Sequence, residues 1–269
     1  MIDYHIHTPL CRHAVGSMGE YLAEAGRKGL IEIGFADHFP LGLLEYIPRS
    51  QVTMDPDELA GYMEDVRQLA LSSAKITVKL GVEVDYLPGK ERKLRELLSC
   101  YPFDYIIGSI HFLDDWDFTH PFYARDYQNR DLKRLYRRYF ALVEEACLSG
   151  LFDLIGHIDV IKKFGFSPDE DLEPYWSRTA SVLKETGTCL ELNTAGRDAP
   201  VGEFYPHRRL LELCLEQGVA VTIGSDAHTP EQVGRHFPEA ETLLKEIGFG
   251  EIAVFTNRRR GALKMGACS

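Results

Sequence analysis

The feature of this sequence that most constrains its fold is a repeated alternation between short apolar segments and segments of helical periodicity. The apolar segments are rich in β-branched residues, and each is followed by a polar cluster and then by apolar residues three or four positions apart. This order predicts parallel strands with helical crossovers. Seven strands are expected, at residues 2–4, 31–36, 76–82, 105–110, 154–156, 189–192 and 219–224. An eighth candidate, residues 252–255, would either close the sheet or flank it.

The segments between these strands carry helix signals. Apolar residues at helical spacing within 18–25 and 59–70 predict two core-facing helices, the second beginning with Asp55 as N-cap and Pro56 at its first position. The longest helix is expected over about residues 131–149, with its basic stripe facing solvent. Left-handed residues that end helices are expected at Gly29, Gly150, Gly187 and Gly218.

Length and composition favour one domain. At 269 residues the chain exceeds the usual domain size, but barrels of alternating strands and helices often use this length as one unit. Hydrophobic residues make up 45% and charged residues 26%, as in ordinary globular proteins, and no repeat or flexible linker interrupts the sequence. We therefore expect residues 1–269 to form a single α/β barrel domain.

Charge and terminal sequence indicate the environment. The formal net charge of -11 repels phosphate backbones, so binding to long nucleic acids is not expected. The first residues lack a signal-peptide pattern, and no apolar run is long enough to cross a membrane, which predicts a cytoplasmic protein without a membrane partner. The six cysteines form no CxxC pair and are expected to be reduced; Cys11, between His7 and His13, has the alternative of binding zinc.

Residues that bind metals or transfer protons follow the expected strands. Seven of the ten histidines belong to this set, which comprises His5, His7, His13, Asp37, His38, Glu83, Asp85, His111, His157, Asp159, Asn193, Asp226 and His228. Loops at the carboxyl ends of barrel strands form the active site in such folds. We therefore expect these side chains to converge at one mouth of the barrel.

Each motif alone is weak evidence for a metal. A single H-x-H pair arises readily by chance, and carboxylates such as Asp37 and Asp226 also cap helices. Burying seven imidazoles together without partners, however, would cost on the order of several kcal/mol, whereas shared metals satisfy their nitrogen atoms. Nitrogen and oxygen ligands suit zinc, iron or manganese, so the joint pattern favours a site for these transition metals.

Six ordered motifs resemble those of the polymerase and histidinol phosphatase (PHP) superfamily over nearly the whole chain. They are Tyr4-His5-Ile6-His7-Thr8, Phe35-Ala36-Asp37-His38, Gly81-Val82-Glu83-Val84-Asp85, Gly108-Ser109-Ile110-His111, Gly156-His157-Ile158-Asp159 and Gly224-Ser225-Asp226-Ala227-His228. The monofunctional histidinol-phosphate phosphatases are similar at further positions, namely Pro9-Leu10-Cys11-Arg12-His13, Pro102-Phe103-Asp104-Tyr105, Lys162-Lys163-Phe164-Gly165 and Asn193-Thr194-Ala195-Gly196.

This resemblance implies a distorted (β/α)7 TIM-like barrel with the active site at the C-terminal ends of the strands. It also implies three divalent or trivalent metal ions. The first would be held by His5, His7, Glu83 and Asp226, the second by Glu83, His111 and His157, and the third by His13, His38 and His228. His120, His207 and His236 have no matching role and are expected at the surface or in packing.

The implied activity is hydrolysis of L-histidinol phosphate to L-histidinol and inorganic phosphate in histidine biosynthesis, a small-molecule phosphate monoester being the partner. Clustered metals would supply both an activated water and positive charge. The catalytic candidates are Asp37, Glu83, Asp226 and His228, and the substrate-binding candidates are Arg197, Lys162 and Asn193. Asp37 has two open roles, as general acid or as a carboxylate orienting a ligand histidine.

Substrate selectivity and overall function have alternatives. Asp114, Asp115 and Asp117 form an acidic loop that would attract the cationic end of histidinol phosphate. Another phosphoesterase of the superfamily, acting on nucleotides, oligonucleotides or phosphotyrosine, would keep the same fold and ligands. A metal-binding module without catalysis is a third reading.

Overall fold

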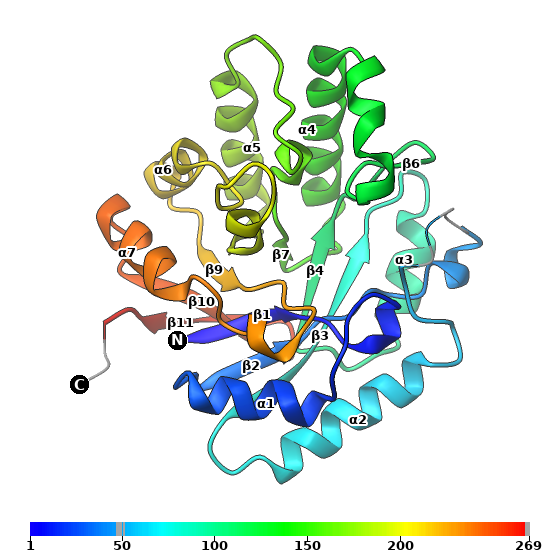
Figure 1. Ribbon diagram of the computed structural model, residues 1–269, viewed down its shortest axis with the longest axis vertical. Coiled ribbons are helices and arrows are strands. Elements are labelled where there is room, and N and C mark those ends of the chain that lie inside the picture. Colours follow the sequence, from blue (N-terminus) through cyan, green and yellow to red (C-terminus); the bar gives the residue numbers. More distant parts are fainter. Residues whose placement is uncertain (47–49, 51, 267–269) are drawn as a thin grey trace.

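A curved sheet of seven parallel strands forms the centre of the computed structural model, which describes residues 1–46, 50 and 52–266 (Figure 1). In spatial order the strands are β1 (Ile2–Ile6), β2 (Glu32–Phe35), β3 (Thr77–Asp85), β4 (Tyr105–Ser109), β7 (Leu154–Ile155), β8 (Cys189–Asn193) and β9 (Val221–Gly224). Every neighbouring pair is parallel. The seven strands predicted from hydrophobic patterning are confirmed, with ends shifted by up to three residues.

The first and last strands of the sheet meet without a continuous ladder. An isolated parallel bridge pairs Ile6 with Ala227. The backbone N–H of His7 donates to the carbonyl of Ala227 at 2.9 Å, and the N–H of Ala227 donates to the carbonyl of His5 at 3.1 Å. The sheet is therefore a nearly closed, distorted barrel. The bridge that joins its first and last strands lies next to the predicted ligands His7 and Asp226.

Tyr105 fills the barrel interior. A Cβ at Gly34 would lie 2.0 Å from the Tyr105 hydroxyl oxygen, and a Cβ at Gly81 would lie 2.2 Å from the ring. The Tyr105 hydroxyl donates to the carbonyl of Tyr4 at 2.7 Å, and the two rings stack with centroids 4.8 Å apart. Both glycines are thus required by the close approach of an aromatic side chain.

Seven α-helices of the described part of the chain cover the barrel. They are α1 (Met18–Arg27), α2 (Leu59–Ser72), α3 (Glu91–Leu98), α4 (Leu132–Leu148), α5 (Glu173–Thr186), α6 (Arg208–Gln217) and α7 (Phe237–Ile247). Helices α4, α5 and α6 pack together on one side, and α1 and α2 lie on the opposite side (Figure 1). Helix α4 has the predicted extent, and all four predicted helix-ending glycines have positive φ.

One predicted helix start is wrong. Helix α2 begins at Leu59, because Asp55 and Glu58 form a separate turn before it. The N–H of Glu58 donates to the carbonyl of Asp55 at 3.0 Å, and the Glu58 carboxylate accepts the N–H of Asp55 at 2.7 Å. Asp55 is therefore part of the turn and does not cap α2.

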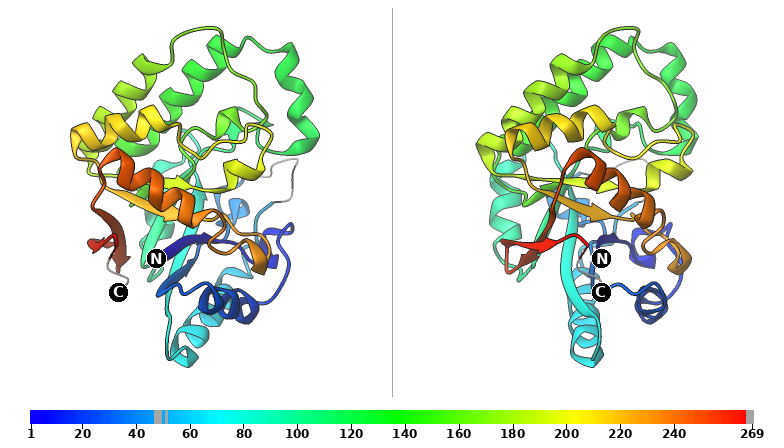
Figure 2. Two further views of the ribbon diagram at one scale, coloured as in Figure 1. Left: turned by 60° about the vertical axis from the view of Figure 1, so that its left-hand side comes forward. Right: turned by 90° about the vertical axis from the view of Figure 1, so that its left-hand side faces the viewer.

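The C-terminal strands flank the barrel. β10 (Glu251–Thr256) and β11 (Arg259–Lys264) form an antiparallel hairpin beside it (Figure 2). The Thr222 hydroxyl of β9 donates to the carbonyl of Ala253 at 2.9 Å. The eighth strand candidate therefore flanks the barrel. None of the helices within the described ranges has the length and apolar character needed to cross a membrane.

Short elements in the loops complete the mouth of the barrel. The 3-10 helices are η1 (Pro9–Cys11), η2 (Leu41–Leu44), η3 (Pro121–Asn129), η4 (Val160–Lys162), η5 (Ala195–Asp198) and η6 (Pro230–Gln232). A two-stranded hairpin, β5 (Phe112–Leu113) with β6 (Trp116–Asp117), follows His111. These loops surround the residues predicted to carry the chemistry.

Candidate metal centre

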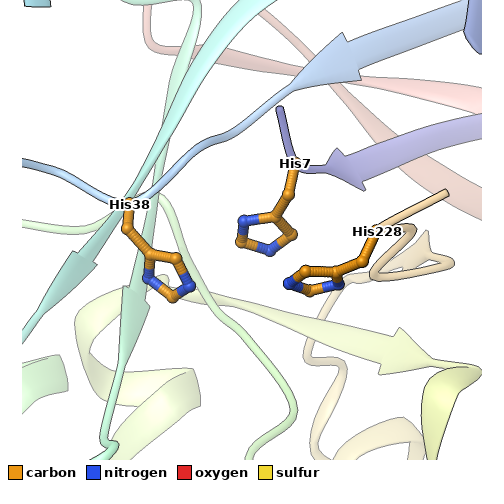
Figure 3. A group of neighbouring side chains, drawn as sticks. All are labelled: His7, His38 and His228. Carbon is orange, nitrogen blue, oxygen red and sulfur yellow. The ribbon is translucent and has the colours of Figure 1, made fainter. Parts of the chain in front are cut away.

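The predicted metal ligands converge at the carboxyl ends of the strands. They border a cavity of about 650 Å³, whose lining includes His7, His13, His38, Glu83, His111, His157, Asp226 and His228. The ninth, His5, lies in β1 with no exposed surface. Figure 3 shows the rings of His7, His38 and His228, which come from three separate segments and face a common space. The convergence predicted from strand-end positions is thus present.

Glu83 is the centre of the cluster. It lies in β3 with 1% of its surface exposed, and the hydroxyl of Ser109 donates to its Oε1 at 2.6 Å. Five ring nitrogens lie close to this carboxylate. From Oε1 the distances are 3.0 Å to His157, 3.5 Å to His5 and 3.6 Å to His111, and from Oε2 they are 3.1 Å to His38 and 3.6 Å to His7.

A second group of imidazoles lies toward the rim. The Nε2 atoms of His13 and His228 are 2.9 Å apart. The ring centroids of His7 and His228 are 4.2 Å apart, and Nε2 of His7 is 3.2 Å from Oδ1 of Asp226. Asp226 has a φ of 52°, a left-handed conformation that turns the chain at the end of β9. This turn brings Asp226 and His228 to the same side of the mouth.

The residues fit transition-metal binding. Nε2 of His5, Nδ1 of His38 and Oε2 of Glu83 are buried and have no hydrogen-bond partner among the residues the structure describes. Such atoms cost about 1–3 kcal/mol each when left unpaired. Nε2 of His111 and Nε2 of His157 are 3.2 Å apart, close to the roughly 3.3 Å that separates two ligands of a tetrahedral zinc ion with bonds of about 2.0 Å. Cations would satisfy these atoms.

The electrostatics of the cluster also require positive charge. Burial disfavours ionisation of Glu83, yet the imidazoles of His5 and His111, whose own pKa values nearby carboxylates raise, hold the pKa of Glu83 well below its usual range. Burial, assisted by neighbouring histidines, lowers the pKa of His38 and of His228 well below the ordinary value. These two rings are therefore neutral and offer lone pairs, as metal ligands must.

Carboxylates stand behind several ligand histidines. Nδ1 of His111 is 2.9 Å from Oδ1 of Asp85, and Nδ1 of His7 is 3.6 Å from Oδ1 of Asp37. Asp37 is fully buried and accepts hydrogen bonds from the N–H of Thr8, at 3.1 Å, and from its hydroxyl. The hydrogen bond from His111 to Asp85 is of the kind that fixes the orientation and tautomer of a metal-binding histidine, whereas Asp37 is within ion-pair range of His7 without a hydrogen bond.

Glu191 is a functional candidate that the sequence reasoning missed. It lies in β8 with no exposed surface, and its Oε1 is 2.7 Å from Nδ1 of His5. A signal was available, because a glutamate within the apolar run 189–192 has the same parity as Asn193. A charged side chain on that face of a barrel strand must have a buried partner.

The predicted substrate contacts do not border the cavity. Lys162 forms ion pairs with Asp159 and Glu203, each at 3.0 Å. Arg197 donates to the carbonyl of Gly202 at 3.0 Å and to Glu239 at 3.1 Å. The amide of Asn193 donates to Glu191 at 3.0 Å. Among the residues that the structure describes, the cations that border the cavity are instead Arg12, Lys163 and Arg235.

The acidic loop after His111 is divided by its hairpin. Asp117 borders both the main cavity and a second depression of about 330 Å³, whereas Asp114 and Asp115 are exposed and border only the second depression. Of the three aspartates, Asp117 is therefore the one that can contact a ligand in the main cavity.

The remaining histidines behave differently from one another. His120 borders the main cavity, and its Nδ1 accepts the backbone N–H of Phe122 at 3.2 Å at the start of η3, a local structural role. His207 stacks on Trp176 with centroids 4.8 Å apart, and His236 pairs with Asp198 at 2.8 Å, as expected of packing and surface residues.

Cys11 lies beside the rim histidines. Burial disfavours its thiolate, but hydrogen bonds with His13 and His7 lower its pKa to about 7. Its sulfur and one nitrogen each of His13 and His228 lie within 4.8 Å of one another, so zinc binding by Cys11 stays a prediction. Cys100, Cys147, Cys189 and Cys214 are free thiols, and Cys268 lies outside the described residues.

The fold and the metal-ligand cluster define the protein family to which the chain belongs. Residues 3–195 match the PHP domain, and the chain belongs to the PHP domain family. Within this family it is similar over most of its length to proteins named as histidinol-phosphatases or probable histidinol-phosphatases. A probable histidinol-phosphatase of Deinococcus radiodurans is 39% identical, covering 96% of this chain and 98% of that protein. The histidinol-phosphatase of Bacillus subtilis is 27% identical, covering 86% and 95%.

Solved structures have the same fold. The putative histidinol phosphatase of Listeria monocytogenes superposes with a TM-score of 0.80 at 25% identity, covering 89% of this chain and 99% of that one. Histidinol phosphate phosphatase of Lactococcus lactis, solved with zinc, L-histidinol and phosphate, gives a TM-score of 0.83 at 23% identity, covering 97% and 98%. The predicted α/β barrel is confirmed by these neighbours.

Proposed function

We propose that the protein is a histidinol-phosphatase, which hydrolyses L-histidinol phosphate to L-histidinol and inorganic phosphate in histidine biosynthesis. The observation that carries the proposal is the convergence of seven imidazoles with the carboxylates of Glu83 and Asp226 at the mouth of the barrel. The full-length similarity to histidinol-phosphatases, including one at 39% identity, supports this substrate over other phosphate esters.

Three metal ions would be held by the nine residues. His5, His7, Glu83 and Asp226 would hold one, Glu83, His111 and His157 a second, and His13, His38 and His228 a third. When bound, zinc, iron or manganese supplies a water of lowered pKa and positive charge that stabilises the phosphoryl group. The zinc in the Lactococcus lactis structure supports zinc among these metals.

Lys163 is the proposed phosphate contact of the protein itself. Its Nζ donates to the carbonyl of Thr119 at 2.9 Å. Because an ammonium has three donors, two are left for a ligand in the cavity that Lys163 borders. Arg235 instead holds the loop after β9 that carries Asp226, because its guanidinium donates to the carbonyls of Ser225 and Asp226, each at 2.9 Å.

Two aspartates have separate proposed roles. Asp117, 5% exposed, is held by the Ser50 hydroxyl at 2.6 Å and borders the cavity, where its carboxylate would attract the ammonium or imidazole end of histidinol phosphate. Asp37 is fully buried behind His7. We assign Asp37 to orienting His7, because a general acid must reach the leaving group.

The proposal extends to location and partners. A cytoplasmic enzyme with net charge -11 would act on a small phosphate ester and would not bind long nucleic acids or membranes. Fractionation of cells that express the protein, followed by immunodetection, is expected to find it in the cytoplasm; recovery with membranes would contradict this assignment.

An ester panel tests the activity. Metal-replete protein is assayed for phosphate release from histidinol phosphate, a nucleoside monophosphate, a short oligonucleotide and phosphotyrosine at equal concentration. Histidinol phosphate is expected to give the highest kcat/KM. A higher value with another ester would favour the alternative phosphoesterase, and inactivity toward every ester would favour a non-catalytic metal-binding module.

A further inference from the structure

We propose that Glu191 is a positioning residue that sets the tautomer of His5 and anchors the main chain of His157; this inference rests on the proposed metal-dependent function. Glu191 lies in β8, with no surface exposed to solvent. Its Oε1 is 2.7 Å from Nδ1 of His5. Its Oε2 accepts the backbone N–H of His157 at 2.7 Å and the side-chain amide of Asn193 at 3.0 Å.

The contact with His5 determines which ring nitrogen carries the proton. An ionised carboxylate only accepts hydrogen bonds, so Nδ1 of His5 must be the donor. When the ring is neutral, as it must be to bind a metal, Nε2 then keeps its lone pair. This Nε2 lies 3.5 Å from Oε1 of Glu83 and 3.9 Å from Oδ1 of Asp226, and it has no hydrogen-bond partner within the described ranges. Glu191 thus presents the lone pair of His5 to the cluster.

The barrel is shaped to hold this carboxylate. A Cβ at Gly224, the last residue of β9, would lie 2.1 Å from Oε1 of Glu191 and 2.6 Å from Cβ of His5. A Cβ at Gly156, directly after β7, would lie 2.8 Å from Ile107 and 2.9 Å from the Ser109 hydroxyl, with Oε2 of Glu191 next at 3.4 Å. Neither glycine has positive φ, so backbone conformation does not require them. The close approach of Glu191 explains why a side chain is excluded at Gly224.

Glu191 connects ligands of two different proposed metal ions. His5 belongs to the first ion and His157 to the second. Asp85 lies behind His111, and Asp37 lies behind His7, so each supports a ligand of one ion. Glu191 contacts the ring of His5 and the backbone N–H of His157. Its own strand, β8, contributes none of the proposed metal ligands. Substitution of Glu191 should therefore weaken the binding of both the ion held by His5 and the ion held by His157.

Glu191→Gln tests the tautomer because Gln has the same shape but exchanges one acceptor oxygen for an NH2 donor. The N–H of His157 cannot become an acceptor, so the Gln oxygen is expected to stay with His157 and the NH2 group to face His5. Nδ1 of His5 would then accept, and Nε2 would carry the proton and lose its ability to bind a metal. Glu191→Asp keeps a carboxylate that only accepts, although it shortens the side chain.

Zinc stoichiometry and affinity are measured by competition with a chromophoric chelator, and cobalt(II) absorption reports ligand geometry. We expect Glu191→Gln to weaken zinc binding about 10- to 100-fold for at least one equivalent and to change the cobalt spectrum. Glu191→Asp should bind zinc more tightly than Glu191→Gln. Glu144→Gln is the matched control, because Glu144 of α4 is also buried but pairs with Arg178 of α5, outside the cavity.

Each result discriminates. Wild-type zinc affinity and cobalt spectrum in Glu191→Gln would overturn the inference, as would tighter zinc binding by Glu191→Gln than by Glu191→Asp, which a purely packing role predicts. Circular dichroism of the metal-free variants establishes whether they fold. If Glu191→Gln does not fold, Glu191→Asp is compared with Glu144→Gln instead. Wild-type zinc affinity in Glu191→Asp then supports the inference, and a loss of affinity of about 10- to 100-fold in Glu191→Asp overturns it. Wild-type protein that binds zinc but hydrolyses no ester would refute only the proposed function.

Discussion

Replacing Glu83 by Gln is expected to disable the enzyme while preserving the fold. The substitution keeps the size of the side chain and removes its negative charge. Glu83 is 1% exposed, and its Oε1 lies 3.5 Å from Nε2 of His5 and 3.0 Å from Nε2 of His157. An amide oxygen is a weaker ligand than a carboxylate and carries no charge to neutralise two cations.

The distances set the size of the effect. A cation held between Oε1 of Glu83 and Nε2 of His5, which are 3.5 Å apart, would lie closer than 3.5 Å to the carboxylate oxygen. At an effective dielectric constant of about 20, a unit negative charge at that distance from a unit positive charge gains about 5 kcal/mol. Rearrangement and entering water will offset part of this gain. A net loss of about 3 kcal/mol already corresponds to more than a hundredfold in binding or rate. We therefore expect at least a hundredfold decrease in kcat/KM for histidinol phosphate.

Phosphate release and bound metal are measured on the same preparations of wild type, Glu83→Gln and the control Glu144→Gln. The Glu83 variant should lose metal together with activity, whereas the control should keep both, because Glu144 pairs with Arg178 outside the cavity. A Glu83→Gln protein with full metal content and activity within tenfold of wild type would refute the assignment of Glu83 as the shared ligand.

Three further predictions concern specificity, packing and metals. Asp117→Asn should raise KM for histidinol phosphate, whereas Asp115→Asn should not, because Asp117 but not Asp115 borders the main cavity; equal KM values in steady-state assays would contradict this. Gly81→Ala should destabilise the fold by about 1–3 kcal/mol, because its methyl group would lie 2.2 Å from the Tyr105 ring, and an unchanged free energy of unfolding in urea would disprove the packing argument. Prolonged dialysis against a chelator should abolish phosphate release and added zinc should restore it; full activity in protein shown to be metal-free would exclude the proposed mechanism.

The strands and most helices were predictable because hydrophobic period is a local property. The helix at 131–149 and the four helix-ending glycines are where their patterns placed them. The start of α2 was not, since Asp55 and Pro56 carry a cap signature that a turn uses equally well. The C-terminal hairpin was also ambiguous, because nothing local distinguishes a strand that closes a barrel from one that packs beside it.

Lys162 and Lys163 show where local reasoning ends. Both follow His157, and both could be read as phosphate contacts from their position after the fifth strand. Residues 160–162 form a 3-10 helix, in which successive side chains point about 120° apart. Lys162 consequently pairs with Asp159 and Glu203, while Lys163 borders the cavity. The direction of each side chain depends on the loop conformation, which adjacent sequence does not specify.

The sequence by itself determined the parallel order of the strands and the identity of the residues at their carboxyl ends, because chain order and side-chain parity carry that information. Only the tertiary structure decided which groups meet across strands. Glu191 is the clearest case: it contacts His5 from a position 186 residues away, and the space at Gly224 makes the contact possible. Such contacts arise from barrel curvature and strand register, which are properties of the whole packed sheet.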